Sequence, residues 1–415
     1  MSEKKHQLVI VGGGTAGITL AATLNRQAGS QKLDIAIIEP ANEHYYQPAF
    51  TLVGAGSYTL DKTRRPQSEL IPAGVDWIQG RASSFDPDNN SLTLESGDKL
   101  SYDYLVLCPG LELNWEKIKG ASEALGSGGV CSNYSPQHVE YTWDCIQQLK
   151  AGSTALFTQA PLPFKCPGAP QKIAYLCADH LRKRDLLKQV NLHFLTHGPA
   201  MFAVPLFAKE LNSVAARYDI NVHFQHNLVA IDADNKQASF EIVGGDKEGE
   251  KVVLDYDMLH FTPPQSPPEA IRNSVLANEA GYVDVNQHSL QHNRFNNVYG
   301  LGDAASTPNS KTAAAVRKQA PVVAHHLLGQ IQGKPSALEY DGYGSCPLTT
   351  AYGKVIMAEF IYGGKVTPTF PLDPRKERWL NWWIKASGLP LFYWHYMLKG
   401  YSWFFQHNTD FVEPG

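Results

Sequence analysis

Two different spacings of apolar residues follow one another along the first forty positions. Residues 8–11 are apolar without a break, residues 18–26 repeat apolar side chains at helical spacing, and residues 33–38 are again mostly apolar. Short unbroken apolar runs are typical of strands buried on both faces, and the helical period indicates a helix that covers them. The N-terminal segment therefore predicts a strand–helix–strand unit of a parallel sheet.

The same alternation returns in the middle of the chain, where residues 154–158 and 190–196 predict strands and residues 171–184 predict a helix. Residues 74–107 alternate apolar and polar positions, which predicts strands with a turn at residues 96–98. We expect an α/β fold with two Rossmann-like dinucleotide-binding domains and a C-terminal amphipathic membrane-binding segment. The expected ranges are 1–115 with 290–340 for the first domain, 116–289 for the second, and 341–415 for the C-terminal region.

A glycine-rich turn joins the first strand to its helix. Gly12 permits the tight turn, Gly14 lets the backbone approach a pyrophosphate, and Gly17 brings helix and strand together. Glu39 ends the second strand, where an acid accepts hydrogen bonds from a ribose. An ordinary Gly-rich loop is the alternative, but the flanking strands and the acid favour a dinucleotide site at the helix N-terminus. The predicted contacts are Gly12, Gly14, Thr15, Ala16, Gly17 and Glu39.

A matching signal lies far downstream. Residues 297–301 form a short strand that stops at Gly302 and Asp303, and Lys311 precedes an Ala-rich helix start. Paired with the N-terminal turn, this arrangement resembles the second FAD motif of flavoproteins with two dinucleotide domains. The resemblance implies that the cofactor is FAD, held by the first and last thirds of the chain.

Composition and charge exclude several classes. The chain of 415 residues has a net charge of −4 and a pI near 6.4, which argues against a nucleic-acid partner. No run of eighteen apolar residues occurs, and the N-terminus has neither an apolar signal region nor a presequence. We therefore expect a peripheral, monotopic protein of a bacterial cytoplasmic membrane. The six cysteines lack metal-ligand spacing, so we expect neither a metal site nor a disulfide framework.

The middle unit lacks what a nicotinamide nucleotide would need. Prolines at positions 161, 163, 167 and 170 stand between its first strand and its helix, and each removes a backbone N–H. No acid follows the strand at 190–196, because His197 stands there. We expect a second dinucleotide-binding architecture whose NAD(P)H site is lost and whose turn carries Cys166.

Cys166 and Cys346 share a setting, since each lies in a Pro- and Gly-containing segment that we expect to be a loop. Loop cysteines can reach solvent and a partner thiol, whereas helical cysteines usually fill core space. From the residues alone, a redox pair and a coincidence both remain open. Cys108, Cys145 and Cys177 lie at a strand end or in helical patterns, and we interpret them as packing.

Short motifs spread over nearly the whole chain carry a specific resemblance. They are residues 12–17, 44–48, 132–135, 164–166, 168–172, 262–264, 302–303, 310–315 and 345–348. With them the chain resembles the sulfide:quinone oxidoreductases of the flavoprotein disulfide reductase superfamily. It looks closest to the branch that includes the mitochondrial enzymes.

The resemblance implies an enzyme that oxidises sulfide and passes two electrons through FAD to a membrane quinone of the ubiquinone type. The family's redox cysteines correspond to Cys166 and Cys346, joined by a bridge of two or three sulfurs. We assign the persulfide to Cys166 and the flavin-side thiolate to Cys346. The sulfane sulfur would pass to a small acceptor such as glutathione or sulfite, or grow into polysulfide. The expected FAD contacts are the glycine-rich turn, Glu39, Gln47, Ala82, Gly302, Asp303 and Lys311.

Three further residues are candidate accessories. Lys165 adjoins Cys166 and could favour its thiolate, although adjacent side chains in an extended loop often point opposite ways. His197 lies where a base would be useful, or is simply a loop histidine. Cys131 stands 35 residues before Cys166, about where one branch of the family has a third redox cysteine, but its flanks match the two-cysteine branch. We expect Cys131 to be a loop cysteine outside the sulfur chemistry.

The C-terminal region is rich in aromatic residues with basic flanks. Five of the eight tryptophans follow residue 378, interleaved with basic residues such as Lys385, and Pro390 separates two apolar runs. Short aromatic helices of this kind suit a membrane interface. An aromatic core or a homodimer interface is the alternative. The residues proposed for a quinone pocket are Phe360, Phe392 and Tyr396.

Two other functions remain in play. A type II NADH:quinone oxidoreductase of similar build would need the Gly-rich turn that the middle unit lacks. A non-catalytic flavin-binding or membrane-associated protein would have no use for a pair of loop cysteines. Sulfide should therefore bleach the flavin, and NADH should not.

Overall fold

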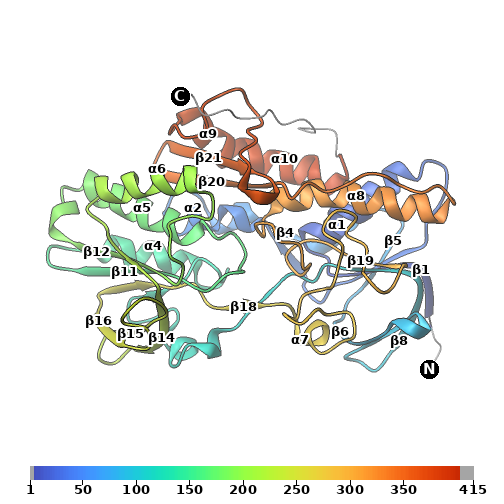
Figure 1. Ribbon diagram of the computed structural model, residues 1–415, viewed down its shortest axis with the longest axis horizontal. Helices are drawn as coiled ribbons and strands as arrows, with labels where there is room; N and C mark the ends of the chain where they lie inside the picture. Colours follow the sequence, from blue (N-terminus) through green and yellow to red (C-terminus); the bar gives the residue numbers. More distant parts are fainter. Residues whose placement is uncertain (1–3, 402–415) are drawn as a thin grey trace.

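The computed structural model describes residues 4–401, which form two sheet-based domains side by side beneath a C-terminal layer (Figure 1). The first sheet has the order β5–β2–β1–β8–β7–β6, with β19 paired to β8. Parallel pairing of β1 with β2 and β8, with α1 crossing between, confirms the predicted strand–helix–strand unit. The bounds are β1 Lys4–Val11, α1 Thr15–Gln27, β2 Ile35–Ile38, β5 Val75–Ile78, β6 Ala82–Asp86, β7 Ser91–Leu94, β8 Lys99–Leu107 and β19 Val298–Gly300.

The downstream strand belongs to the same sheet as the N-terminus. β19 runs parallel to β8, and the N–H of Gly302 just after it donates to Gln319 of α8 (Ala313–Ile331) at 2.8 Å. A Cβ on Gly302 would lie 3.2 Å from the Cβ of Ala16 at the start of α1. The two motifs that the sequence places far apart therefore meet at one end of α1.

The second sheet is wholly parallel, in the order β10–β17–β11–β12–β13. Its helices cover the sheet on the side of the C-terminal layer, and an antiparallel ribbon flanks it (Figure 1). The bounds are β10 Val130–Cys131, α4 Val139–Gln148, β11 Thr154–Gln159, α5 Ala169–Lys183, β12 Asn191–Thr196, α6 Pro205–Arg217, β13 Asn221–Phe224 and β17 Met258–His260, with ribbon strands β14 His226–Asp232, β15 Gln237–Ile242 and β16 Lys251–Asp255. The middle of the chain thus has the predicted strands and helix.

Short elements connect these units. The chain passes between the two domains along the antiparallel pair β9–β18. The remaining short elements are β3 Glu43–Tyr45, α2 Phe50–Val53, β4 Arg64–Pro66, β9 Glu112–Leu113, α3 Ala121–Ala124, β18 Gln265–Ser266 and α7 Glu269–Arg272.

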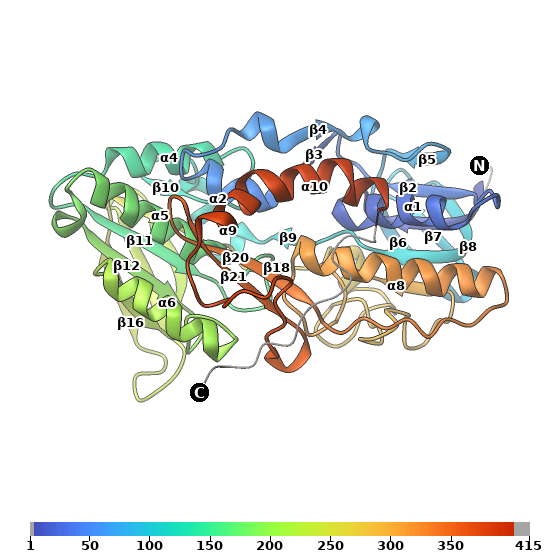
Figure 2. The ribbon, with the colours of Figure 1, turned by 90° about the horizontal axis from the view of Figure 1, so that it is seen from above.

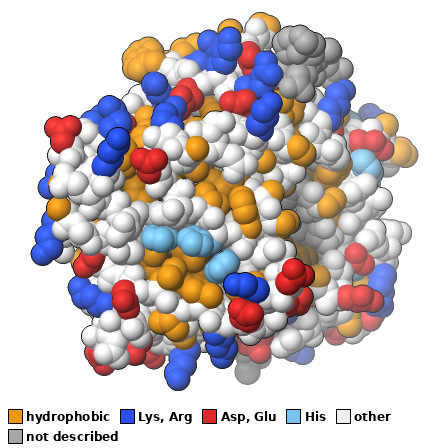
Figure 3. Space-filling view, turned by 60° about the vertical axis from the view of Figure 1, so that its left-hand side comes forward, with side chains coloured by type: hydrophobic (Ala, Val, Ile, Leu, Met, Phe, Trp, Pro, Cys, Tyr) orange, Lys and Arg blue, Asp and Glu red, His pale blue; other side chains and the backbone are white. Residues whose placement is uncertain are grey.

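The outer end of the second domain carries histidine side chains in a row among apolar ones (Figure 3). In this domain His193 and His223 stack with ring nitrogens 3.0 Å apart, and His223 lies edge-on to His226. Within residues 4–401, no group of three or more His, Cys, Asp or Glu side chains is arranged as a metal site. We interpret the histidines as a polar edge of the sheet.

The C-terminal layer lies across both domains (Figure 2). It consists of the hairpin β20–β21 and a helical stretch from residue 379 to 395. Pro390 does not separate the stretch, because the helical backbone conformation continues from the π-helical segment through Gly388 into α10. The bounds are β20 Gly344–Ala351, β21 Lys354–Phe360, α9 Trp379–Trp383, a π-helical segment Ile384–Gly388 and α10 Leu389–His395.

This helical stretch has two faces. Tyr393 and Trp394 are buried in the core that also contains α1 and α8. Trp379 and Trp383 are instead 68% and 50% exposed. No helix within the described residues is long and apolar enough to cross a bilayer. The structure describes residues 391–401 of the aromatic run that follows Pro390, and residues 402–405 lie outside the described range.

Candidate active site

The fold brings Cys166 and Cys346 together, although 180 positions separate them in the chain. Their thiols are hydrogen-bonded to each other. Cys166 lies in the loop after β11, with a left-handed φ of 53°, and its N–H donates to the carbonyl of Lys311 at 2.8 Å. Its own carbonyl accepts from the N–H of Ala169 at 2.8 Å, at the start of α5.

Cys346 corrects one expectation, because it lies in strand β20 rather than in a loop and is only 1% exposed. Pro347 is tolerated beside it because β20 and β21 form a two-stranded sheet, whose outer edge needs no ladder bond. A Cβ on Gly168 would lie 2.7 Å from the sulfur of Cys346. Glycine at this position therefore lets the Cys166 loop close onto the strand.

Lys172 places a positive charge against the pair. It lies on the first turn of α5, is 2% exposed, and its Nζ is 3.4 Å from the Cys166 sulfur. The Cys346 thiol that donates to Cys166 lowers the pKa of Cys166 well below its ordinary value, and Lys172 adds to this despite burial. The pKa of Cys346 is raised by the same hydrogen bond and by burial. When the cysteines are reduced, Cys166 is therefore the one that ionises first, and its thiolate accepts the hydrogen bond from the Cys346 thiol.

A second lysine reaches the site from the C-terminal layer. Lys385 is 4% exposed in the π-helical segment, and its charge acts on both Cys166 and Cys346. The expectation that Lys385 flanks a membrane-facing helix is therefore wrong, because the helix turns this side chain inward. Lys172 was overlooked as well, although it stands in one of the family motifs. Periodic spacing gave no signal for it, because Cys166 lies before α5 and the two residues are six positions apart.

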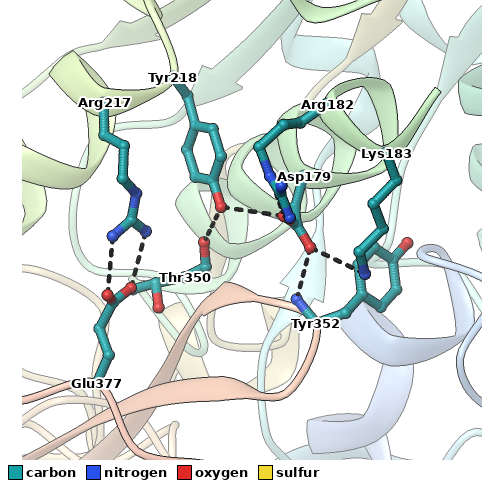
Figure 4. Close-up of polar contacts among 8 residues, drawn as sticks. All are labelled: Asp179, Arg182, Lys183, Arg217, Tyr218, Thr350, Tyr352 and Glu377. Carbon is teal, nitrogen blue, oxygen red and sulfur yellow. Dashed lines mark hydrogen bonds and ion pairs between the residues drawn. The ribbon is translucent and has the colours of Figure 1, made fainter. Parts of the chain in front are cut away.

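The far end of α5 is tied to the same hairpin by a buried carboxylate (Figure 4). Asp179 accepts from Arg182 at 2.8 Å, pairs with Lys183 at 3.2 Å, and accepts from the backbone N–H of Tyr352 at 3.1 Å. Burial would raise the pKa of Asp179, but the hydrogen bonds from Arg182 and Lys183 outweigh it and hold the pKa below its ordinary value. The carboxylate thus anchors the turn of the hairpin that carries Cys346.

Helix α6 and the C-terminal segment strengthen this anchor (Figure 4). The Tyr218 hydroxyl donates to the carbonyl of Thr350 at 3.0 Å, and Arg217 makes two hydrogen bonds of 2.8 Å to Glu377. Thr350 also hydrogen-bonds to Glu377. Because α5 begins beside Cys166 and ends beside this cluster, the register of β20 against α5 is held at both ends.

The first domain has the cradle that a dinucleotide requires. A Cβ on Gly12 would overlap the carbonyl of Cys108, and one on Gly17 would overlap the carbonyl of Gly12. Space in front of Gly14 is open to 4 Å. The Glu39 carboxylate accepts from the N–H groups of Gly13 and Ala41, both at 2.8 Å. A cavity of about 160 Å³ next to the turn is lined by residues that include Gly12, Glu39 and Ala82, and it suits the adenosine end of FAD.

Charged residues of the second motif lie between this cradle and the cysteines. Lys311 is buried and donates to the carbonyl of Thr307 at 3.1 Å; burial lowers its pKa to about 8, while Asp303 opposes the shift. Burial also lowers the pKa of Lys165, and the charges of Asp303 and Cys166 oppose it. Asp303, Lys165 and Cys166 are therefore electrostatic neighbours, but the lysine that touches the Cys166 sulfur is Lys172.

The C-terminal layer also reaches the glycine-rich turn. The Tyr393 hydroxyl lies 2.7 Å from the hydroxyl of Thr15 and 2.6 Å from Nε2 of His44. Ala16 is buried behind the turn, and Gln47 is exposed in the 3₁₀ turn that follows β3. α10 therefore closes over the site at which a pyrophosphate would lie.

Cys131 and His197 have other surroundings. Cys131 lies in strand β10, not in the predicted loop, since it pairs with β17 inside the second sheet. Its thiol hydrogen-bonds to Cys145 and Thr142, and burial raises its pKa well above the ordinary value. His197 follows β12, and burial lowers the pKa of its imidazole.

The three residues proposed for the quinone pocket fall into two packing groups. Phe360 packs edge-on against Phe202 at 5.8 Å, in the core that contains Cys346. Phe392 on α10 and Tyr396 just after it stack with ring centroids 6.1 Å apart, and Phe392 packs against the core around α1. A cavity of about 10 Å³ beyond β11 is lined by residues that include Gln159, Ala160 and Pro161.

Known proteins resemble this chain along its length. A sequence-family model described as pyridine nucleotide-disulphide oxidoreductase matches residues 6–138. A mitochondrial sulfide:quinone oxidoreductase of Dictyostelium discoideum is 42% identical over 96% of this chain and 87% of its own length. The corresponding protein of Mus musculus is 41% identical over 96% and 88%.

The fold agrees with a solved relative. The sulfide:quinone oxidoreductase of the hyperthermophilic bacterium Aquifex aeolicus superposes with a TM-score of 0.80 at 22% identity, over 96% of this chain and 92% of that one. That likeness concerns the fold, whereas the identity to the first two relatives extends over nearly the whole sequence. This chain belongs to the sulfide:quinone oxidoreductase family.

Proposed function

We propose that Cys166 and Cys346 are the sulfide-oxidising centre of this FAD-dependent sulfide:quinone oxidoreductase. The observation that supports it best is the buried hydrogen bond between the two thiols, with Lys172 at 3.4 Å from the Cys166 sulfur. A cysteine is reactive as its thiolate, and a nearby ammonium favours that form. The chain therefore supplies both the sulfur pair and the charge that activates it.

In the oxidised protein the two cysteines form a disulfide or, with one extra sulfur atom between them, a trisulfide. The sulfide sulfur attacks the Cys166 sulfur, the bond toward Cys346 breaks, and Cys166 keeps the new sulfur as a persulfide. The group that leaves on Cys346 is a thiolate from a disulfide and a persulfide anion from a trisulfide. Lys172 hydrogen-bonds to both sulfurs, so its charge stabilises the anion on either one. FAD, when bound, accepts the two electrons and passes them to a quinone.

The chain's own residues would hold the cofactor at two ends. The glycine-rich turn with Thr15 and Ala16 would bind the pyrophosphate at the N-terminus of α1. Glu39 and Ala82 would face the adenosine, and Gly302, Asp303, Lys311 and Gln47 the flavin half. These residues do not react; they set the distance between the flavin and the sulfur pair.

The exposed side of the C-terminal helix would dock on a quinone-containing membrane. Trp379, Leu380, Trp383 and Leu391 are between 46% and 68% exposed on this one stretch, and such residues suit the membrane interface. The relatives are named mitochondrial, whereas the N-terminus led us to expect a bacterial membrane. Glutathione or sulfite is the proposed acceptor of the sulfane sulfur.

Single serine variants test the sulfur pair. Mixing the oxidised protein with sulfide without quinone should bleach the flavin and raise a long-wavelength charge-transfer band. Cys166→Ser and Cys346→Ser should abolish both changes, because either variant removes the bridge. Cys131→Ser should react less than tenfold more slowly, because its thiol pairs with Cys145 instead.

Two results would count against the proposal. Full loss in Cys131→Ser would require a third cysteine in the mechanism. Bleaching by NADH would favour an NADH:quinone oxidoreductase, whose Gly-rich turn is replaced here by a loop with prolines at positions 161, 163, 167 and 170.

A further inference from the structure

One lysine of the C-terminal helix points the opposite way from its neighbours. Trp383 and Leu391 are 50% and 57% exposed, whereas Lys385 between them is 4% exposed. The helix changes to π geometry at residues 384–388, and such a segment shifts the direction of the side chains that follow. π-helical turns occur frequently at functional sites, and here the irregularity coincides with a buried amine.

The surroundings of Lys385 contain sulfur and a second amine. Its Nζ lies 3.4 Å from the carbonyl of Pro48, and the next residue, Ala386, packs against the core that includes Cys346. The charged groups that act on it are Lys172 from α5, Cys166 from the loop and Cys346 from β20.

These neighbours make the charge of Lys385 conditional. Burial and the positive charge of Lys172 lower its pKa to about 7, while negative charge on Cys166 and Cys346 raises it. When the cysteines are bridged and carry no charge, burial still lowers the pKa of Lys385 and neither of the raising causes is left. The amine is then neutral, and it gains a proton when an anion forms on the sulfurs.

We propose that Lys385 is a catalytic residue that accepts the proton of hydrogen sulfide as its sulfur attacks the bridge. The inference rests on the proposed roles of Cys166 and Cys346. A neutral H₂S molecule enters a buried site at lower cost than an ion does, but it must lose a proton to become a strong nucleophile. A neutral amine that interacts electrostatically with both cysteines meets that need.

The step balances with the groups present. The sulfur of H₂S forms a bond to the Cys166 sulfur, and the bond from that sulfur toward Cys346 breaks. The bonding pair leaves with Cys346, which becomes a thiolate if the bridge is a disulfide and a persulfide anion if it is a trisulfide. One proton of H₂S stays on the new persulfide and the other passes to Lys385, so a neutral amine becomes an ammonium as the anion forms. Sulfide is oxidised and the bridge is reduced by the same two electrons.

Three substitutions at one position test this role in the FAD-loaded protein. In single mixing with sulfide and no quinone, Lys385→Met should slow flavin bleaching about 100-fold or more, the usual contribution of a positioned base. Lys385→Arg should be as slow, because a guanidinium keeps the charge but accepts no proton. Methylamine added to Lys385→Ala should restore part of the rate.

Controls separate this role from a structural one. Lys209→Met removes an exposed lysine on α6 and should leave the rate unchanged. With the cysteines reduced, the pH midpoint of Cys166 alkylation by iodoacetamide should be compared in Lys385→Met and the parent. The two midpoints should differ by less than the shift that Lys172→Met causes.

The outcomes distinguish the two levels of the proposal. A Lys385→Met rate within twofold of the parent, restoration by Arg, or no rescue by methylamine would overturn the role of Lys385 alone. If Cys166→Ser also retained bleaching by sulfide, the assignment of the sulfur pair itself would fail.

Discussion

At the scale of single residues, the reactivity of Cys166 depends on helix geometry rather than on its neighbour in sequence. Lys165 is adjacent in the chain, but its backbone N–H is held by Gln265, and its side chain is an electrostatic neighbour of Asp303. Lys172 is six positions away, yet the first turn of α5 brings its Nζ to 3.4 Å from the sulfur. Proximity in the fold therefore identifies the activating lysine.

The pH dependence of alkylation tests this assignment. An ammonium within a few ångströms lowers a thiol pKa by about 1–3 units, so Lys172→Met should raise the midpoint of Cys166 alkylation by about that amount. The sign follows from the direction of the shift: the thiolate present at neutral pH in the parent should form only at higher pH in the variant.

Mass spectrometry of the Cys166 peptide, with iodoacetamide and the reduced protein, gives the midpoint. Lys165→Met is the matched control and should shift the midpoint less than Lys172→Met does. If Lys165→Met shifted the alkylation midpoint as much as Lys172→Met or more, Lys165 would be the lysine that stabilises the Cys166 thiolate.

At the scale of elements, helix α5 and the hairpin that begins with β20 contact each other at both ends of α5. The reactive end has Cys166, Lys172 and Cys346, and the other end has Asp179 against the backbone of Tyr352. Residues 172 and 179 are seven positions apart and so lie on one face of the helix. Loss of the Asp179 hydrogen bonds should therefore also change how Cys346 is positioned against Cys166.

The change Asp179→Asn should lower the free energy of unfolding by about 1.5–3 kcal/mol, the usual worth of buried hydrogen bonds to a charged group. The Arg182 and Lys183 side chains are about half exposed, so their ion pairs contribute little of this. Urea titration measures the stability of the variant. Bleaching of the flavin by sulfide should also be slower in Asp179→Asn than in the parent.

Arg182→Gln is the control and should cost less than about 1 kcal/mol, because its partner keeps the hydrogen bond from Tyr352. Unchanged bleaching in a destabilised Asp179→Asn protein would mean that the cluster supports the fold without positioning Cys346.

At the scale of the whole molecule, the C-terminal layer has several tasks at once. Its inner side completes the core through Tyr393 and Trp394 and delivers Lys385 to the cysteines. Its outer side presents Trp379 and Trp383. Removing residues 376–415 would therefore damage core, active site and docking surface together, and point substitutions are the cleaner test of membrane binding.

The double variant Trp379→Ser with Trp383→Ser should bind liposomes at least tenfold more weakly, because each tryptophan contributes more than about 1 kcal/mol on burial in an apolar environment. Sedimentation with vesicles measures the bound fraction, and sulfide bleaching in solution should be unchanged.

Val253→Ser is the matched control, since Val253 is 53% exposed on the ribbon of the other domain, away from the C-terminal layer (Figure 1). If the double variant and the parent bind vesicles equally, the exposed tryptophans are not the membrane-docking surface.

The sequence by itself determined the local units and the cofactor motifs. Unbroken apolar runs and helical spacing were enough for the strand–helix–strand units, because those periods reflect which side chains must be buried. The turn from Gly12 to Gly17 was recognisable because its chemistry is local. Motifs quoted from the whole chain were enough to suggest the family, which the 42% identity to a named relative then established.

Only the tertiary structure decided what surrounds the sulfurs. Neither Lys172 nor Lys385 could be assigned from sequence, since a helix turn and a π-helical irregularity set their directions. Cys346 was expected in a loop because Pro347 adjoins it, but an edge strand accommodates that proline. The approach of residues 166 and 346 depends on the packing of α5 against a distant hairpin, and such long-range contacts leave no periodic trace in the chain.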